Sequence, residues 1–181
     1  GVSWYEALAY ARYVKKDLPS GDHWGIARGE GTFVIRWPQM GGFAVFAPFS
    51  NFNHKGPVTV GSLDGTSAYG AYDMAGNVRE WCKNNTQFGK LIRGGGWNSN
   101  TYEFNHPSQA PALDRSETNG FRCALYLDAS PLPEPVYRLT QVLQPEVYPK
   151  DYVNLVSDDV FNIYKGFYDY DQTALNTKVL S

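Results

Sequence analysis

The chain has 181 residues, with 16 Lys and Arg against 18 Asp and Glu, and a formal net charge of -2. This length allows one domain with an extension, and the lack of a basic excess argues against nucleic acid as a partner. No apolar run approaches the roughly 18 residues of a membrane span, and no signal peptide is recognisable, so we expect a cytoplasmic protein without a membrane partner.

The first predicted element is a helix over residues 4–15. Ser3 and Glu6 form an S-x-x-E capping box, and apolar residues recur at helical spacing after it. Leu18-Pro19 ends this segment. Ser20 is then a suitable N-cap for a second, short helix that reaches about Arg28.

From Gly29 to Gly120 the pattern breaks into short aromatic or β-branched pieces separated by Gly, Asn and Pro. Such pieces predict irregular strands and long ordered loops, hence an α+β fold. They are Thr32–Trp37, Phe43–Phe46 and Val58–Val60. A further strand is predicted to leave the core through the glycines at 94–96, and Gly120–Cys123 is predicted to be an apolar strand whose arginine is paired inside the protein.

The composition changes near Asp128. All 5 tryptophans and nearly all of the 18 glycines lie in residues 1–120, whereas the prolines concentrate after residue 130. Alternating prolines in Ser130–Pro135 predict an extended linker. We therefore predict two parts: a head, residues 1–128, and a Pro- and Tyr-rich acidic tail, residues 129–181, which serves as a linker or as a strap on the head.

The segment Tyr69–Trp81 is the densest in potential chemistry. Asp73 and Glu80 are hard oxygen ligands on either side of a flexible turn, and calcium binds such oxygens. The alternative is that Asp73 caps a turn and that Glu80 pairs with an arginine, Arg93 or Arg122. Spacing alone favours this alternative, because the segment is not an EF-hand loop.

Six pieces of the head, taken in order, resemble the formylglycine-generating enzyme, or sulfatase-modifying factor, family. They are Val2–Ala11, Leu18–Trp24, Pro57–Ser62, Tyr69–Trp81, Arg93–Trp97 and Asn119–Arg122. The resemblance implies an irregular, loop-rich C-type-lectin-like fold with two N-terminal helices, in which the amino-terminal part of the family domain is absent. It also implies calcium on the side chains of Asp73 and Glu80 and on the carbonyl groups of Gly76 and Val78.

The same resemblance implies that the copper site is missing. Family oxidases bind copper(I) through two cysteines, and soft thiolates suit that ion. The matching positions are Ser99 and Phe104, or their immediate neighbours, and no cysteine lies between the chain's two cysteines, Cys82 and Cys123. We therefore expect no copper and two free thiols, and we hypothesise a binding or regulatory module without catalytic residues.

We expect the ligand to be a small molecule or peptide held in a cleft of aromatic and amide side chains. The candidate residues are Arg79, Trp97, Asn98, Ser99, Tyr102, Phe104 and His106. Two alternatives remain: an oxidase that makes formylglycine from a cysteine of a protein substrate, and a structural spacer. The sequence is most similar to a bacterial branch of the family in which the domain lies between a serine/threonine kinase and an α/β-hydrolase, so both are expected neighbours in a longer chain.

Overall fold

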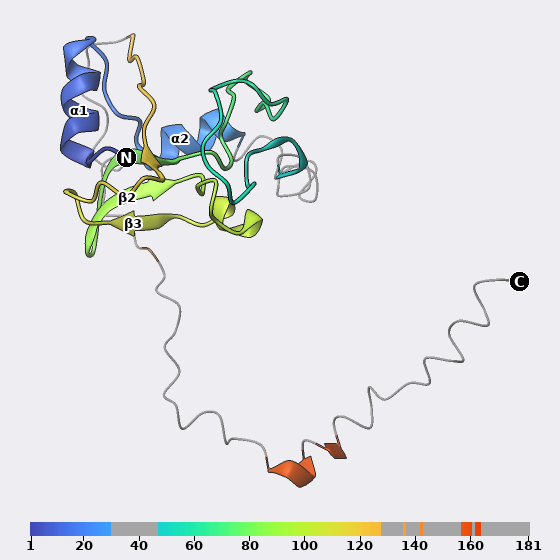
Figure 1. Ribbon diagram of the computed structural model, residues 1–181. Coiled ribbons are helices and arrows are strands. Elements are labelled where there is room, and N and C mark those ends of the chain that lie inside the picture. Colours follow the sequence, from blue (N-terminus) through green and yellow to red (C-terminus); the bar gives the residue numbers. More distant parts are fainter. Residues whose placement is uncertain (30–46, 128–135, 137–141, 143–156, 161, 164–181) are drawn as a thin grey trace, which may run out of the picture. The chain divides into compact units, whose positions relative to one another are not determined.

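The structure is a computed structural model that describes residues 1–29, 47–127, 136, 142, 157–160, 162 and 163 (Figure 1). The chain divides into two units, residues 1–142 and residues 143–181. In the second unit, residues 158–160 are helical. All elements described below belong to the first unit.

Two helices open this unit, as the sequence predicts. Helix α1 spans Trp4–Tyr13, and its capping box is present, because the Ser3 hydroxyl accepts from the Glu6 N–H and the Glu6 carboxylate accepts from the Ser3 N–H. The helix ends two residues before the predicted limit, since Lys15 adopts a left-handed conformation (φ 56°). Helix α2 spans Gly21–Arg28 with Ser20 as its N-cap.

A mixed four-stranded sheet follows, with the order β3-β2-β1-β4. Strands β1 and β2 form an antiparallel hairpin, β3 extends it beside β2, and β4 runs parallel to β1. The bounds are β1 Arg79–Thr86, β2 Gly89–Arg93, β3 Ser108–Ala110 and β4 Asn119–Gly120. The predicted strand before the glycines at 94–96 is thus confirmed as β2.

The central hairpin is buried on both faces. Neighbouring residues of a strand point to opposite faces, and here Trp81 and its partner Ile92 pack with α1, whereas Cys82 and Leu91 pack with Trp24 of α2. Each helix therefore covers one face of the same two strands, and two of the three core clusters among the described residues lie on these faces.

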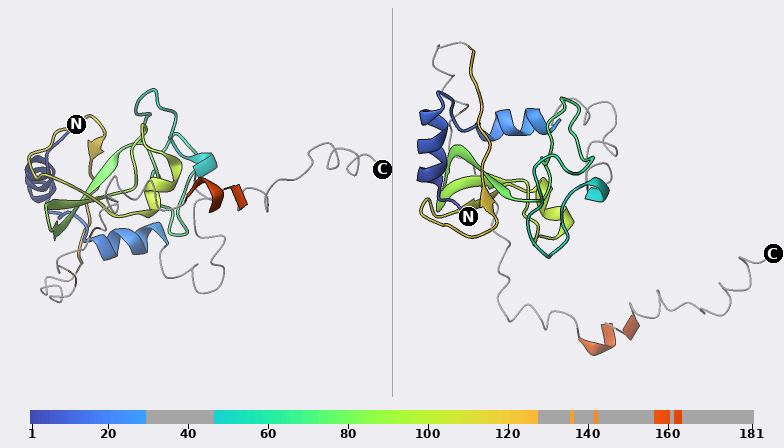
Figure 2. Two further views of the ribbon diagram at one scale, coloured as in Figure 1. Left: turned by 90° about the horizontal axis from the view of Figure 1, so that it is seen from below. Right: turned by 45° about the horizontal axis from the view of Figure 1, so that its top comes forward.

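The loops gather away from α1. The chain after β4 returns beside α1, where Asp17 and Ala124 exchange two backbone hydrogen bonds (Figure 1). The loops that include the 3₁₀ helix η1, Ala47–Phe49, lie at the opposite end of the unit (Figure 2). A second 3₁₀ helix, η2, spans Thr101–Asn105. The α+β, loop-rich prediction is confirmed.

One predicted strand is mostly wrong and another is entirely wrong. Only Gly120 of the predicted strand Gly120–Cys123 lies in β4, and residues 121–123 form no strand. Val58–Val60 lies in a loop, because the backbone groups of Val58 bond to the side chain of Asn77 and not to another strand. The predicted strands Thr32–Trp37 and Phe43–Phe46 lie outside the described residues. Among the residues that are described, no helix is both long and apolar enough to cross a membrane.

Most of the predicted linker and tail also lies outside the described residues. Two of the described residues beyond position 128 contact the head. The Val136 carbonyl accepts a hydrogen bond from Asn84 Nδ2 at 3.1 Å, and Val142 packs on the core cluster around Trp24. The boundary at residue 128 stays a prediction.

Candidate functional site

One asparagine joins three loops at the end of the sheet. Asn77 is buried, and its side-chain oxygen accepts hydrogen bonds from Asn51 Nδ2 at 3.1 Å and from the Val58 N–H at 2.9 Å. Its backbone carbonyl accepts from the Trp97 N–H at 2.8 Å. The loop around residues 51–58 and the loop after β2 are therefore both fixed to the residue that leads into β1.

The turn before β1 requires its sequence. Gly76 and Asn77 have φ angles of 70° and 63°, in the left-handed region that glycine and asparagine enter more easily than other residues. A Cβ atom added to Gly76 would lie 2.4 Å from the Asn51 carbonyl oxygen. Any larger residue at position 76 would therefore push the 51–58 loop away.

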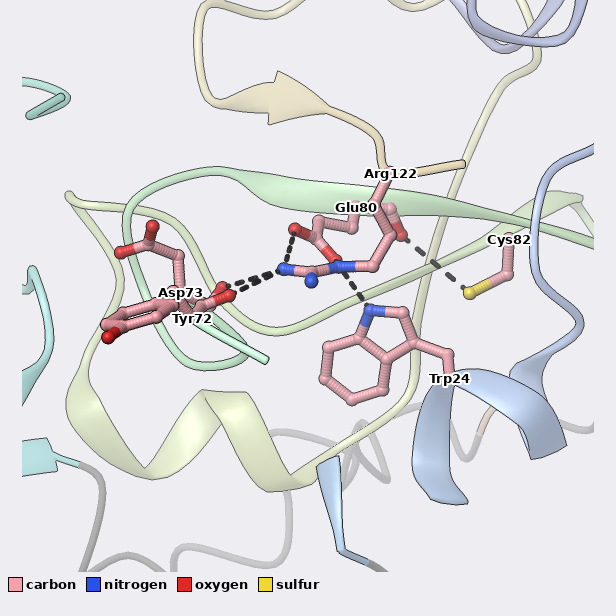
Figure 3. A network of polar contacts seen from close by, with 6 residues as sticks. All are labelled: Trp24, Tyr72, Asp73, Glu80, Cys82 and Arg122. Carbon is pink, nitrogen blue, oxygen red and sulfur yellow. Dashed lines mark hydrogen bonds and ion pairs between the residues drawn. The ribbon is translucent and has the colours of Figure 1, made fainter. Parts of the chain in front are cut away.

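A second group of polar contacts, beside the one around Asn77, forms around the buried carboxylate of Glu80 (Figure 3). The two oxygens of Glu80, on β1, accept from Trp24 Nε1 at 2.6 Å, from Arg122 Nε at 2.5 Å and from Arg122 Nη2 at 2.7 Å. The predicted pairing of Glu80 with Arg122 is thus confirmed. The other candidate, Arg93, instead lies over the Trp24 ring, 4.8 Å from its centroid.

Arg122 extends this group of contacts into the loop at 69–76. Its Nη2 group also donates to the Tyr72 carbonyl at 2.9 Å (Figure 3). Burial lowers the pKa of Arg122, but the neighbouring Glu80 carboxylate outweighs burial and the pKa is raised overall. Arg122 therefore keeps its charge and ties the loop, β1 and α2 together through Glu80.

The predicted calcium site is not assembled by these side chains. The Asp73 carboxylate accepts from the Gly61 N–H at 2.7 Å and points away from Glu80 (Figure 3). The Glu80 oxygens already accept hydrogen bonds from Arg122 and Trp24. Calcium needs six to eight oxygens, so the side chains do not fit the ion in this arrangement. In the described part of the chain, no three His, Cys, Asp or Glu residues cluster as a metal site. Calcium at Asp73, Gly76, Val78 and Glu80 stays a prediction of the resemblance alone, and this arrangement of the side chains argues against it.

The residues predicted to line a ligand cleft divide between the core and the surface. Phe104 is fully buried against Ala75 and Phe52, and Ser99 is buried with its hydroxyl accepting from the Gly96 N–H at 3.1 Å. The exposed candidates are Asn98, Tyr102 and His106. Phe104 therefore serves the core in this structure.

The two remaining candidates, Arg79 and Trp97, are partly buried and lie at one junction. The Arg79 N–H donates to the Thr118 carbonyl at 2.7 Å, and Trp97 bonds to Asn77, two residues before Arg79. A Cβ atom added to Gly96, next to Trp97, would lie 3.0 Å from Thr118 Cβ. The glycine at position 96 thus allows the loop after β2 to pass close to Thr118.

The positions matched to copper ligands lie near each other but carry other chemistry. A Cβ atom added to Gly95 would lie 3.6 Å from Ser99 Cβ and 3.5 Å from the Phe104 nitrogen. Both cysteines are elsewhere and form no disulfide. Cys82 faces α2 in the core, and burial raises the pKa of the Cys123 thiol.

Two residues of the site escaped the sequence analysis. Asn51 and Asn77 carry the loop contacts, yet an asparagine in a loop-rich sequence predicts no partner. The signal at Asn77 was its place after Gly76, because a Gly-Asn pair is typical of left-handed turns. Asn51 carried no comparable signal.

Comparisons with known proteins agree with this geometry. A family model for the sulfatase-modifying factor enzyme 1-like domain matches residues 1–127. Serine/threonine-protein kinase pkn1 of Chlamydia pneumoniae is 32% identical over 148 aligned residues, which cover 68% of this chain and 23% of the kinase. The formylglycine-generating enzyme of Thermomonospora curvata is 32% identical over 97 residues, covering 45% of this chain and 31% of the enzyme.

The chain spans less than a third of either relative's length. A solved structure, that of CarF, is 20% identical, with a TM-score of 0.55 and coverage of 70% of this chain and 66% of that one. This likeness supports the fold alone.

Proposed function

Because the chain belongs to the sulfatase-modifying factor enzyme 1-like domain family, we propose that its head is a binding module that does not oxidise cysteine. The observation that carries the proposal is the pair of positions 99 and 104. Where the resemblance places thiolates, this chain has a hydroxyl bonded to the Gly96 N–H and a phenyl ring in the core. Neither group binds copper(I), which prefers soft sulfur ligands.

The rest of the scaffold supports binding. Asn77 fixes the loop that carries Trp97, and fixed aromatic side chains with nearby amides give a ligand contact area and orientation. A rigid set of loops lowers the entropy lost on binding. The loss of thiolates therefore need not remove the recognition surface.

The proposal is tested by an oxidation assay and a binding assay on the full chain. A cysteine-containing peptide is incubated with the protein, copper(I) and oxygen, and the product is analysed for an aldehyde by mass spectrometry. We expect no aldehyde above the level of the copper-only control. Enzyme-dependent aldehyde would overturn the proposal and favour the oxidase.

In the binding assay, a library of small molecules and peptides is titrated against the protein and against Trp97→Ala. We expect a ligand whose affinity falls in the variant. Equal binding by both proteins would remove Trp97 from the site.

We further propose that the module works inside a longer chain with a kinase domain. The support is that the relatives with 31–32% identity over 148 residues are serine/threonine kinases of which the matched segment is 23%. The coding sequence on both sides of this segment tests the proposal. A complete reading frame without a kinase domain would contradict it.

A further inference from the structure

Trp97 differs from the other tryptophans that the structure describes. The indole N–H groups of the other three donate to protein oxygens at distances of 2.6–2.8 Å. These three are Trp4, Trp24 and Trp81. In Trp97, Nε1 is buried and meets no acceptor among the described residues. Buried N–H groups are nearly always paired, so this donor indicates a missing partner.

Arg79 presents a second donor of the same kind. Its Nε atom is buried without an acceptor in the described part of the chain, while its Nη2 group donates to the neutral Asn119 Oδ1 at 2.8 Å. The Asp114 carboxylate accepts from Asn119 Nδ2 at 2.9 Å, and it interacts with Arg79 through charge alone, without a hydrogen bond. Arg79 forms no direct ion pair with any described residue, so a positive charge faces the junction without an oxyanion on it.

The backbone segments that carry the two donors adjoin near Thr118 and Asn77. Arg79 bonds through its backbone to Thr118, and the segment that carries Trp97 passes Thr118 at Gly96 and bonds to Asn77. Both side chains are only partly buried, and the residue after Trp97, Asn98, is exposed. Each side chain therefore reaches the surface in part, although its donor atom is buried.

We propose that this junction binds an oxyanion, a carboxylate or phosphate group of a small molecule or peptide, through the Trp97 Nε1–H and the Arg79 Nε–H. The inference rests on the proposed function, because it names the ligand chemistry of the binding module. An oxyanion fits better than a neutral acceptor, since it attracts the guanidinium charge and makes the hydrogen bond from the neutral indole N–H a charge-assisted one, which is about twice as strong as a neutral one. Arg79 supplies the charge, and the indole supplies a neutral donor that orients the second oxygen.

The test uses the full chain and three N-acetylated tripeptide amides: Ala-Glu-Ala, Ala-phosphoserine-Ala and Ala-Gln-Ala. Affinities are measured by calorimetry, and the Trp97 indole proton is followed by NMR. We expect at least one anionic peptide to bind about tenfold more tightly than the glutamine peptide. The indole proton of Trp97 should move downfield as it gains an acceptor, and comparison of the two anionic peptides identifies the group.

Two variants assign the contacts. Trp97→Phe keeps an aromatic ring without the N–H, and Arg79→Gln removes the guanidinium, so each should lower the affinity for the anionic peptide about tenfold. Arg12→Gln removes an exposed arginine of α1 and is the matched control. The melting temperature of each variant shows whether it is folded. The NMR experiment uses the unaltered protein, so it tests the proposal even if a variant does not fold.

The inference is overturned by equal binding of the three peptides, or by an indole proton that none of them moves. Either result without aldehyde formation leaves the proposed binding module standing with another ligand chemistry. Aldehyde formation in the oxidation assay would instead remove the proposed function itself.

Discussion

Replacing Glu80 by glutamine should destabilise the head more than any exposed charge change. The side chain of Glu80 is 6% exposed and that of Arg122 is 27% exposed. The substitution keeps an oxygen for Trp24 Nε1–H but removes the negative charge that faces Arg122. The cost therefore comes mainly from a partly buried guanidinium without its counter-ion.

The expected size follows from this burial. Removing one partner of a buried ion pair costs about 3–5 kcal/mol, and the partial exposure of Arg122 places the loss near the lower end. In a domain of this size, about 1 kcal/mol corresponds to a shift of roughly 3–4 °C in melting temperature. Glu80→Gln should therefore lower the melting temperature by roughly 10 °C.

Urea denaturation followed by tryptophan fluorescence measures the effect, with Glu117→Gln as the control because Glu117 is exposed and loses the same charge. Arg122→Gln and the double variant complete a double-mutant cycle. The double variant should lose less than the sum of the single variants by about 1 kcal/mol or more, since residues in one ion-pair network are coupled. A cost below about 0.5 kcal/mol for Glu80→Gln, or strict additivity, would refute this role for the pair.

Three further results are expected. Asn77→Gly should lower the free energy of unfolding in urea by about 2 kcal/mol, because it removes the side-chain hydrogen bonds to Asn51 and Val58 but tolerates the positive φ. Asn77→Ala should cost roughly 1 kcal/mol more, because alanine is strained at this φ. Equal costs for the two variants would refute the strain. The pKa of Asp114 is lowered in the folded protein, mainly by hydrogen bonds from Ser116. The ionised carboxylate therefore stabilises the fold above its ordinary pKa of 3.8, and this stabilisation is lost as the pH falls through the lowered pKa of the folded state. The difference in melting temperature between the unaltered protein and Asp114→Asn should accordingly shrink on acidification below about pH 4, and a constant difference would contradict the shift. Added calcium should leave the melting temperature unchanged, since Glu80 is already occupied; a rise that Glu80→Gln abolishes would establish the ion.

Local chemistry made the helices and the central strand predictable. Ser3 with Glu6 and Ser20 with its following turn specify where helices begin, because capping uses residues that are adjacent in sequence. The strand before the glycines at 94–96 was predictable from its apolar residues. The sheet order was not, because the parallel pairing of β1 with β4 joins segments about forty residues apart.

The candidate site was predictable in position but less so in chemistry. The Asp73–Glu80 segment stood out by its residue types, and those types suit either an ion or an arginine. Which of the two is used depends on Arg122, whose position was fixed by the long-range pairing of β4. Val58 failed as a strand residue for a related reason, since a distant side chain, Asn77, provides its hydrogen bonds.

The alternation of β1 separates the structural and the recognition roles of neighbouring residues. Glu80 shares the α2 face with Cys82 and is enclosed by Trp24 and Arg122, whereas Arg79 points toward Asn119. Since adjacent strand residues face opposite ways, a change at Glu80 should act on stability, and a change at Arg79 should act on ligand affinity. An anionic ligand should therefore stabilise Glu80→Gln by as much as it stabilises the unaltered protein, even though the variant melts at a lower temperature.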